Sequence, residues 1–349
     1  MDSTDSVSKS FGGKSVLITG ICGTVGKEIL RQLIEMDVER IVGLDINENE
    51  IFSLADAYRD KPKVTMYYGS LRDRESLNER LRGIDIVLHT AALKHVGVCE
   101  SSPRDAVLTN INGTINLIDA ATESGVERVL FTSSDKAVNP TNVMGTSKLM
   151  GERLMTAATG NGADGRPILA STRFGNVLGS RGSVVPIFHQ RIEMGGPLRL
   201  THADMTRFIM TLEEAVHLVL RSVFMAYGGE VFVTKMPVVR IDDLAYAMID
   251  LLAPRFGHDP KNIAIEMMGT RPGEKMYEEL FNDEETRRTL ETDLYYVILP
   301  ALAPQMKNAS ERYPGCRPTT ADHPYNSALA EPMSRDELKT YLLERGLLD

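Results

Sequence analysis

The segment that decides the fold is a short apolar run leading into a cluster of glycines: Ser15-Val16-Leu17-Ile18-Thr19-Gly20-Ile21-Cys22-Gly23-Thr24-Val25-Gly26. The first five residues are typical of a buried strand. Helical spacing of apolar residues then begins at Val25 and continues through Ile29 and Leu33. A second apolar run, residues 40–45, follows this helix and ends at Asp45. The segment is therefore predicted to form the first turn of a β-α-β unit.

Strand-like and helical patterns continue to alternate along the first half of the chain. Apolar runs typical of strands lie at residues 64–68, 84–89, 129–132 and 168–173, and helical patterns at 75–81, 103–122 and 142–157. Repeated βα units with fully apolar strands favour the α/β class, with a doubly wound parallel Rossmann sheet. After Arg173 glycines punctuate a loop-rich region, and a strand–helix pair at 230–252 is expected to return to the first sheet.

The composition excludes several classes of protein. The chain has 349 residues, 42% of them hydrophobic and 25% charged, as in an ordinary globular protein. Its 39 basic and 48 acidic residues give a net charge of −9, which disfavours nucleic acid and anionic membranes as partners. No apolar run approaches the roughly 18 residues of a membrane span. The three cysteines are far apart and odd in number, which fits reduced thiols, and we expect a cytoplasmic protein. The histidines lack ligand-like spacing, so no metal is expected.

The glycine cluster predicts a dinucleotide site. Glycines at positions 20, 23 and 26 permit a tight turn and close approach to a pyrophosphate at the helix N-terminus, where Thr24 and Val25 lie. Asp45 follows about 20 residues on, where an acid hydrogen-bonds the ribose 2′-hydroxyl and repels a 2′-phosphate. No arginine follows it in Ile46-Asn47-Glu48, so NAD is favoured over NADP.

Two further strand ends are expected to complete this site. Ser70 and Leu71, after the third strand, are expected to flank the adenine. The segment after the fourth strand, Ala91-Ala92-Leu93-Lys94, is expected to line the ribose and nicotinamide side.

The segment after the fifth strand carries acid–base chemistry. Ser134-Asp135-Lys136 follows an apolar strand, and a helix then presents Met144 and Lys148 four residues apart on one face. This layout resembles the catalytic segment of extended short-chain dehydrogenase/reductases, in which a Tyr and a Lys occupy the helix. Here Met144 stands at the Tyr position, and a thioether cannot take a proton.

Several motifs narrow the resemblance to one subfamily. They are Ala91-Ala92-Leu93-Lys94-His95-Val96, Thr109-Asn110-Ile111-Asn112-Gly113-Thr114, Ser134-Asp135-Lys136-Ala137-Val138-Asn139-Pro140, Arg173-Phe174-Gly175-Asn176-Val177-Leu178-Gly179, Asp204-Met205-Thr206-Arg207-Phe208 and Arg271-Pro272-Gly273-Glu274-Lys275. Together they resemble the UDP-N-acetylglucosamine 4,6-dehydratases, from about Lys14 to Leu348. The resemblance implies an NAD-dependent lyase that oxidises sugar C4, eliminates the C5 proton with the C6 hydroxyl, and returns hydride to C6.

The resemblance also implies roles for the catalytic segment. Asp135 would protonate the departing C6 hydroxyl, and Lys136 would remove the C5 proton, made acidic by the 4-ketone. Lys148 would hold the nicotinamide ribose hydroxyls, and Ser134 would hydrogen-bond the C4 hydroxyl. Met144 leaves open which group takes the C4 proton, and retention or inversion at C5 stays open as well.

The implied substrate contacts come from later motifs. Asn176, Arg207 and Arg271 would contact the diphosphate, and Glu274 the ribose hydroxyls of the nucleotide. Ser183 and Val184 would border the base. Lys94 is expected to reach a phosphate of either substrate or cofactor.

The expected organisation follows from these assignments. We expect a disordered tail over residues 1–13, an NAD-binding Rossmann domain over 14–175 with a return segment at about 229–255, and mainly a smaller C-terminal α+β substrate lobe over 176–349. Helices at 103–122 and 142–157 resemble those that pair subunits in this superfamily, so a homo-oligomer, dimer or higher, is expected.

Three alternative functions remain open from the sequence. A 5,6-dehydratase would return hydride to C4, and a 4-epimerase would change only the C4 configuration. A Rossmann binding protein without activity would have Met144 as its lesion, although such a protein has no need of Asp135, Lys136 and Lys148.

Overall fold

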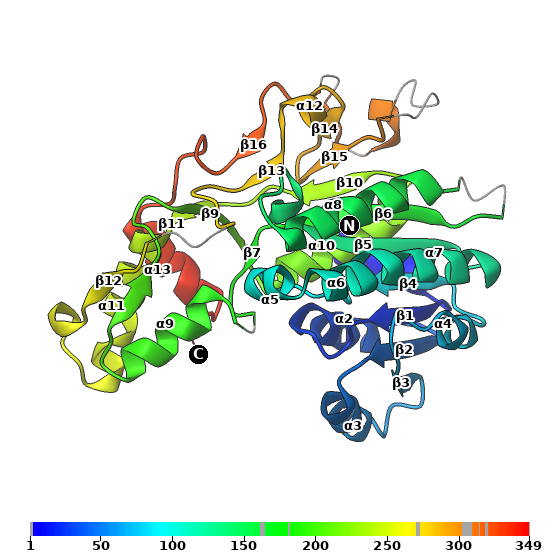
Figure 1. Ribbon diagram of the computed structural model, residues 1–349, viewed down its shortest axis with the longest axis horizontal. Helices are drawn as coiled ribbons and strands as arrows, with labels where there is room; N and C mark the ends of the chain where they lie inside the picture. The colour runs from blue at the N-terminus through cyan, green and yellow to red at the C-terminus, as the bar shows by residue number, and fades with distance from the viewer. Residues whose placement is uncertain are drawn as a thin grey trace.

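A parallel β-sheet forms the centre of the molecule. The computed structural model describes residues 3–160, 165–180, 182–269, 273–301, 309–313, 315–317 and 320–348. Seven parallel strands lie in the order β3-β2-β1-β4-β5-β6-β10 (Figure 1). They are β1 (Ser15–Thr19), β2 (Arg40–Asp45), β3 (Val64–Tyr68), β4 (Ile86–His89), β5 (Arg128–Ser134), β6 (Ile168–Phe174) and β10 (Val231–Thr234). The predicted Rossmann sheet is confirmed, with its topological switch between β1 and β4.

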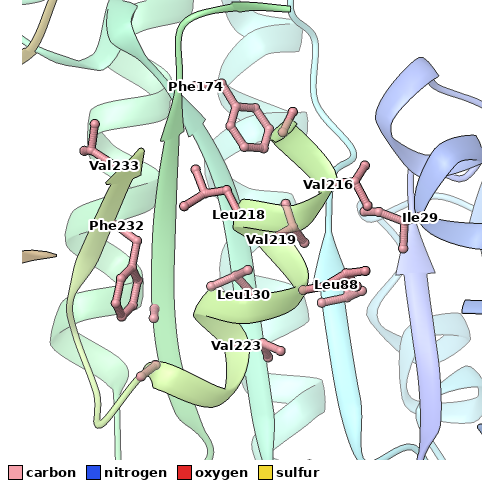
Figure 2. Packing of buried hydrophobic residues seen from close by; sticks show 14 of the residues in the cluster. Ile29, Leu88, Leu130, Phe174, Val216, Leu218, Val219, Val223, Phe232 and Val233 are labelled. Carbon is pink, nitrogen blue, oxygen red and sulfur yellow. The ribbon is translucent and has the colours of Figure 1, made fainter. Parts of the chain in front are cut away.

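Helices cover both faces of this sheet because its strands are apolar on both sides. Side chains of α2 (Thr24–Ile34), α3 (Glu48–Ala57) and α10 (Leu212–Met225) share one core with Val16 and Ile18. Figure 2 shows this packing around Ile29, Leu88, Leu130, Val216, Val219 and Val223. The opposite face packs Leu17 against α4 (Arg74–Arg80), α7 (Gly113–Glu123) and α8 (Val143–Ala158). Two short helices, α5 (Val96–Ser101) and α6 (Pro103–Ala106), precede α7.

The N-terminal segment differs from the expected disordered tail. Residues Ser3–Phe11 form helix α1. Phe11 is fully buried and packs edge-on against Phe224 of α10, with ring centroids 4.7 Å apart. A single buried aromatic residue therefore anchors a segment whose serine-rich composition is typical of a tail.

The C-terminal half forms a second lobe with its own core. Its helices are α9 (Val184–Glu193), α11 (Ile241–Leu252) and α13 (Arg335–Glu344), which pack through residues such as Phe188, Met248 and Leu338. Short strands flank them: β8 (Leu198–Leu200) pairs with β12 (Ile265–Met267), and β9 (Thr206–Met210) lies between β7 (Asn176–Val177) and β11 (Val238–Arg240). In Figure 1 this lobe lies to the left of the sheet.

The division between the lobes differs from the expected one in two respects. The return segment is split, since β10 joins the central sheet whereas α11 belongs to the second core. Two later strands, β14 (Thr289–Glu291) and β15 (Tyr295–Ile298), extend the central sheet as antiparallel neighbours of β10. Strand β13 (Glu279–Phe281) pairs with β16 (Tyr325–Asn326) and packs Leu280 and Phe281 into the core of the central sheet, and helix α12 (Asp283–Thr286) follows it. Among the described residues, no helix has both the length and the apolar character needed to cross a membrane.

A buried ion triad joins these parts. Arg173 of β6 is fully buried and donates to both carboxylate oxygens of Glu152 on α8, at 2.9 and 2.7 Å. It also donates to both oxygens of Glu285 on α12, at 2.7 and 2.8 Å, and to the carbonyl of Leu280 at 2.8 Å. All five guanidinium N–H donors are thus used. Burial raises the pKa of Glu285, but Arg173 outweighs burial and holds that pKa below its ordinary value.

Replacing Arg173 should lower stability more than replacing an exposed arginine. Arg173→Met leaves two buried carboxylates without a counter-ion, which costs about 3–5 kcal/mol. The matched control is Arg199→Met, because Arg199 pairs with Glu266 on the surface, where a pair contributes about 0–1 kcal/mol. Thermal unfolding followed by circular dichroism compares the two variants. Equal unfolding midpoints would contradict a structural role for the triad.

Candidate functional site

One cavity collects most of the residues predicted from the sequence. It has a volume of about 1030 Å³ and lies at the carboxyl ends of the parallel strands, where ligands bind in open α/β sheets. Its lining comes from the residues that follow β1, β2, β3, β4, β5 and β6. A volume near 1000 Å³ matches the upper range of small-molecule sites.

The glycine turn after β1 is shaped by close backbone contacts. Gly20 has a φ of +73°, and a Cβ there would lie 2.7 Å from the Cα of Ala91. A Cβ on Gly26 would overlap the carbonyl oxygen of Gly20, so helix α2 approaches the turn closely only because that position is glycine. Gly23 is the N-cap of α2, and Thr24 and Val25 of its first turn line the cavity.

Asp45 is fixed at the end of β2. One carboxylate oxygen accepts the backbone N–H of Cys22 and the other that of Asn47, each at 3.0 Å. The residues predicted to follow the next strands, Ser70, Leu71, Ala91, Ala92 and Lys94, also line the cavity.

Asn110, which no sequence pattern marked as a site residue, positions the loop after β4. Its amide accepts from the backbone N–H of Leu93 at 2.8 Å and donates to the carbonyl of Leu93 and the hydroxyl of Ser147, both at 2.9 Å. Asn110 lies in a π-helical stretch, Val107–Asn112, that interrupts the helix predicted over 103–122. Such stretches are frequent at functional sites. An asparagine within a helical pattern was the one feature of the sequence that could have pointed to a role for Asn110.

Asp135 and Lys136 lie on a 3₁₀ turn, Asp135–Ala137, directly after β5. The Ser134 hydroxyl donates to Asp135 Oδ1 at 2.5 Å, and Lys136 Nζ lies 3.0 Å from the same oxygen. Asp135 is 1% exposed, and its Oδ2 has no hydrogen-bond partner among the described residues. Helix α8 can lie against this turn because residue 145 is glycine. A Cβ on Gly145 would overlap the Lys136 carbonyl oxygen.

A second carboxylate, that of Glu278, contacts the same lysine and was not predicted. Glu278 Oε1 lies 3.3 Å from Lys136 Nζ and 3.7 Å from Arg207 Nε. Burial, followed by the Asp135 charge, raises the pKa of Glu278. Burial alone would lower the pKa of Lys136, but Asp135 and Glu278 outweigh it and raise that pKa. Lys136 is therefore protonated in this arrangement.

Lys148 and Met144 lie on the helix beside the pair, and both line the cavity. Lys148 Nζ donates to the carbonyl of Thr132 at 2.8 Å and lies 4.6 Å from the Phe131 ring centroid. Burial lowers the pKa of Lys148 to about 8. Met144 is buried against Cys99 and Ala106.

The predicted substrate contacts are only partly brought together. Asn176 and Ser183 line the cavity, and Asn176 Oδ1 and Ser183 Oγ are buried without hydrogen-bond partners among the described residues. Val184, Arg207 and Glu274 are not in the lining. Arg207 instead donates to the carbonyls of Thr206 and Lys275, at 2.7 and 2.8 Å. Arg271 lies outside the described residues.

His95 lines the cavity, whereas His89 is buried outside its lining. Burial lowers the pKa of His89 to about 3, so its ring is neutral beside Thr19, whose hydroxyl lies 2.7 Å from Nδ1. No group of three or more His, Cys, Asp or Glu side chains is arranged to hold a metal in the described part of the chain.

Comparison with known proteins places the chain among sugar-nucleotide enzymes. It is 37% identical over 294 residues to a UDP-N-acetylglucosamine 4,6-dehydratase (inverting) of Campylobacter jejuni, covering 84% of each chain. It is 36% identical over 340 residues to a UDP-glucose 4-epimerase of Rickettsia massiliae, covering 95% of this chain and 96% of that one. The X-ray structure of Pen from Bacillus thuringiensis matches with a TM-score of 0.89 at 37% identity, covering 97% of this chain and 99% of that one.

The family assignment rests on the extent of these matches. The profile of the family described as "Polysaccharide biosynthesis protein" matches residues 16–300. The chain therefore belongs to the polysaccharide biosynthesis protein family of extended short-chain dehydrogenase/reductases, together with its UDP-N-acetylglucosamine 4,6-dehydratase relatives.

Proposed function

We propose that the protein is an NAD-dependent nucleotide-sugar 4,6-dehydratase that acts on UDP-N-acetylglucosamine. The observation that carries this proposal is the Ser134–Asp135–Lys136 arrangement in the same cavity as the glycine turn and Asp45. An acid and a base on adjacent residues suit an elimination, and the Campylobacter dehydratase relative supports the substrate class.

The cavity fits a dinucleotide at its glycine turn. Thr24 and Val25 of the first turn of α2 line the cavity, and the N–H groups of a helix N-terminus suit a diphosphate. Each oxygen of Asp45 accepts one backbone N–H and retains a lone pair for an adenosine ribose hydroxyl. Ser70 and Leu71 would flank the adenine, and Ala91, Ala92 and Lys148 the nicotinamide ribose. Bound NAD supplies the hydride acceptor for C4 and the hydride donor for C6.

In this proposal, Asp135 receives the C4 proton that a tyrosine would otherwise take. The Ser134 hydroxyl already donates to Asp135 Oδ1 at 2.5 Å. With the C4 hydroxyl donating to Ser134 Oγ, the C4 proton passes to Ser134 as the Ser134 proton passes to Asp135. Asp135 is then a carboxylic acid, the form needed to protonate the departing C6 hydroxyl. Met144 needs no proton role in this scheme.

Lys136 is the base of the elimination. Once the C4 ketone has formed, the C5 proton is acidic, and neutral Lys136 removes it while Asp135 gives its proton to the C6 oxygen, which leaves as water. Protonated Lys136 later returns a proton to C5. Lys148 adds positive potential beside the developing negative charge at the C4 oxygen.

Substrate contacts are proposed from unsatisfied polar atoms. Asn176 Oδ1 and Ser183 Oγ, buried in the lining without partners among the described residues, would bond the sugar nucleotide. A buried polar atom without a partner costs about 1–3 kcal/mol, which a ligand would relieve. For Arg207, Arg271, Glu274, Val184 and Lys94, contact with the nucleotide stays a prediction.

A 4-epimerase is the second candidate, because the Rickettsia UDP-glucose 4-epimerase matches nearly the whole chain. Epimerisation needs one group to take and return the C4 proton, and Met144 removes the usual phenol. The Ser134–Asp135 hydrogen bond would have to serve in both directions.

Incubation with UDP-N-acetylglucosamine should give a product lighter by one water with a 4-keto signal, followed by NMR and mass spectrometry. The same mass loss with vinylic protons and no ketone would indicate a 5,6-dehydratase. Unchanged mass with altered C4 configuration would indicate an epimerase. No turnover of any nucleotide sugar would exclude all three activities.

Lys136→Ala should stop exchange of the C5 proton with solvent while NAD binding persists, because the variant lacks the base but keeps the glycine turn. The control is Lys235→Ala, which removes a half-buried pair with Glu291 outside the cavity lining. Deuterium incorporation measured by NMR distinguishes them. Exchange at the wild-type rate in Lys136→Ala would contradict the assignment.

C4 oxidation should slow as pH rises through about 8, because Lys148 loses its charge there. Below that pH the Lys148 ammonium stabilises negative charge at the C4 oxygen. Above that pH the neutral amine no longer does so. Single-turnover formation of reduced nicotinamide measures the rate. Lys148→Gln should be about 10²–10³-fold slower and should lack this dependence. An unchanged pH profile in that variant would argue against a charged role for Lys148.

A further inference from the structure

Lys136 has two carboxylate neighbours, and they differ in their relation to the cavity. Lys136 Nζ lies 3.0 Å from Asp135 Oδ1 and 3.3 Å from Glu278 Oε1. Asp135 and Lys136 line the cavity, whereas Glu278 is outside the lining and only 2% exposed. Glu278 therefore contacts the base without lying where a substrate would bind.

The proton count of the proposed reaction requires an acceptor besides Asp135. This argument rests on the proposed function. Lys136 begins as an ammonium and must be neutral before it can take the C5 proton. Asp135 cannot accept the Lys136 proton if it has already received the C4 proton through Ser134. Glu278 is the other carboxylate within ion-pair distance of Lys136 among the described residues.

We infer that Glu278 is a positioning residue that holds the Lys136 proton during the elimination. In this step one N–H bond of the Lys136 ammonium breaks and an O–H bond forms on a Glu278 oxygen. Neutral Lys136 then takes the C5 proton, and Asp135 gives the former C4 proton to the leaving C6 oxygen. After Lys136 has returned a proton to C5, Glu278 gives its proton back, and the site regains its starting state.

The surroundings of Glu278 suit this task. Its Oε1 lies 3.3 Å from Lys136 Nζ and is the oxygen that would take the proton, while Oε2 is buried and has no hydrogen-bond partner among the described residues. Its backbone N–H donates to Ser327 Oγ at 2.9 Å, which fixes the residue. Arg207 lies 3.7 Å from Oε1 and is itself held by the carbonyls of Thr206 and Lys275. The transfer leaves the summed charge of Asp135, Lys136, Glu278 and Arg207 unchanged, which avoids a net buried charge.

The order of events also follows from charge. In the resting site two carboxylates stabilise the Lys136 ammonium, and burial makes the Glu278 carboxylate easier to protonate. Once Asp135 is protonated, one of the two opposing charges is gone, and the ammonium is less favoured. Oxidation at C4 thereby prepares Lys136 to act as a base.

The experiment compares Glu278→Gln with wild type on UDP-N-acetylglucosamine in deuterated buffer. Glutamine keeps the shape but cannot hold the proton. We expect C5 exchange and turnover to fall about 10²–10⁴-fold with little change in KM. C4 oxidation, seen as reduced nicotinamide in a single turnover, should persist. Glu278→Asp, which keeps a carboxylate one methylene further back, should recover part of the loss.

Glu279→Gln is the matched control. Glu279 is the adjacent carboxylate, but its Oε2 accepts a hydrogen bond from Asn139 Nδ2 at 3.1 Å and lies 3.9 Å from Lys275 Nζ. This variant should exchange the C5 proton at the wild-type rate. Thermal unfolding and NAD binding report whether each variant is folded. If Glu278→Gln does not fold, an intermediate C5 exchange rate in Glu278→Asp supports the inference.

Several results would overturn the inference. Unchanged exchange in Glu278→Gln, or in Glu278→Asp if only that variant folds, would show that Glu278 is structural. Faster exchange in Glu278→Gln would show that Glu278 only keeps Lys136 protonated. Wild-type protein that neither dehydrates the substrate nor exchanges C5 would reject the proposed function, and this inference with it. Loss of C5 exchange in Glu278→Gln, with exchange kept in the wild type and in Glu279→Gln, supports both the proposed function and this inference.

Discussion

The guanidinium of Arg173 holds together three segments that are far apart in the sequence. It joins β6 to helix α8 through Glu152, to strand β13 through Leu280 and to helix α12 through Glu285. Because all its donors are used and all its partners are buried, the relative positions of these segments are tightly constrained. Lys148 lies one turn before Glu152 on α8, and Glu278 lies just before Leu280. The triad thus fixes the elements that bring Lys148 and Glu278 to the site.

The candidate site is a second ionic cluster built on this frame. Asp135, Lys136, Glu278 and Arg207 alternate in charge, and each contacts the next. In a buried site a proton can move within such a cluster at much lower cost than it can leave it. This property suits an elimination, in which an acid and a base must exchange states within one turnover. In the proposed mechanism, this cluster would take the proton role that the tyrosine position, here Met144, cannot fill.

Much of the fold could be predicted because its strands are apolar on both faces. The predicted ranges 40–45 and 64–68 coincide with β2 and β3. Helix α1 escaped prediction because its anchor is a single buried phenylalanine, Phe11. Strands β14 and β15 escaped because their antiparallel pairing with β10 is a long-range contact that no local pattern signals.

The cavity residues that could be predicted lie at the ends of strands or on the helix that presents Met144 and Lys148. Asp45 is the last residue of β2 and Asp135 directly follows β5, and parallel strands bring such positions to one edge. Glu278 lies in Tyr277-Glu278-Glu279, a polar sequence that suggests an exposed loop, and its burial depends on Lys136 and Arg207 from distant segments. The sequence pointed to a substrate contact for Arg207, whereas the fold engages its donors within the protein.

The most direct test of the central claim is the fate of the hydrogen at C4. UDP-N-acetylglucosamine deuterated at C4 should be converted by the wild-type protein to a 4-keto product whose C6 methyl group carries the deuterium. NMR and mass spectrometry of the product locate the label. Deuterium that remains at C4, in an epimer or in an unsaturated sugar, would contradict a 4,6-dehydratase in which Asp135 and Lys136 perform the elimination.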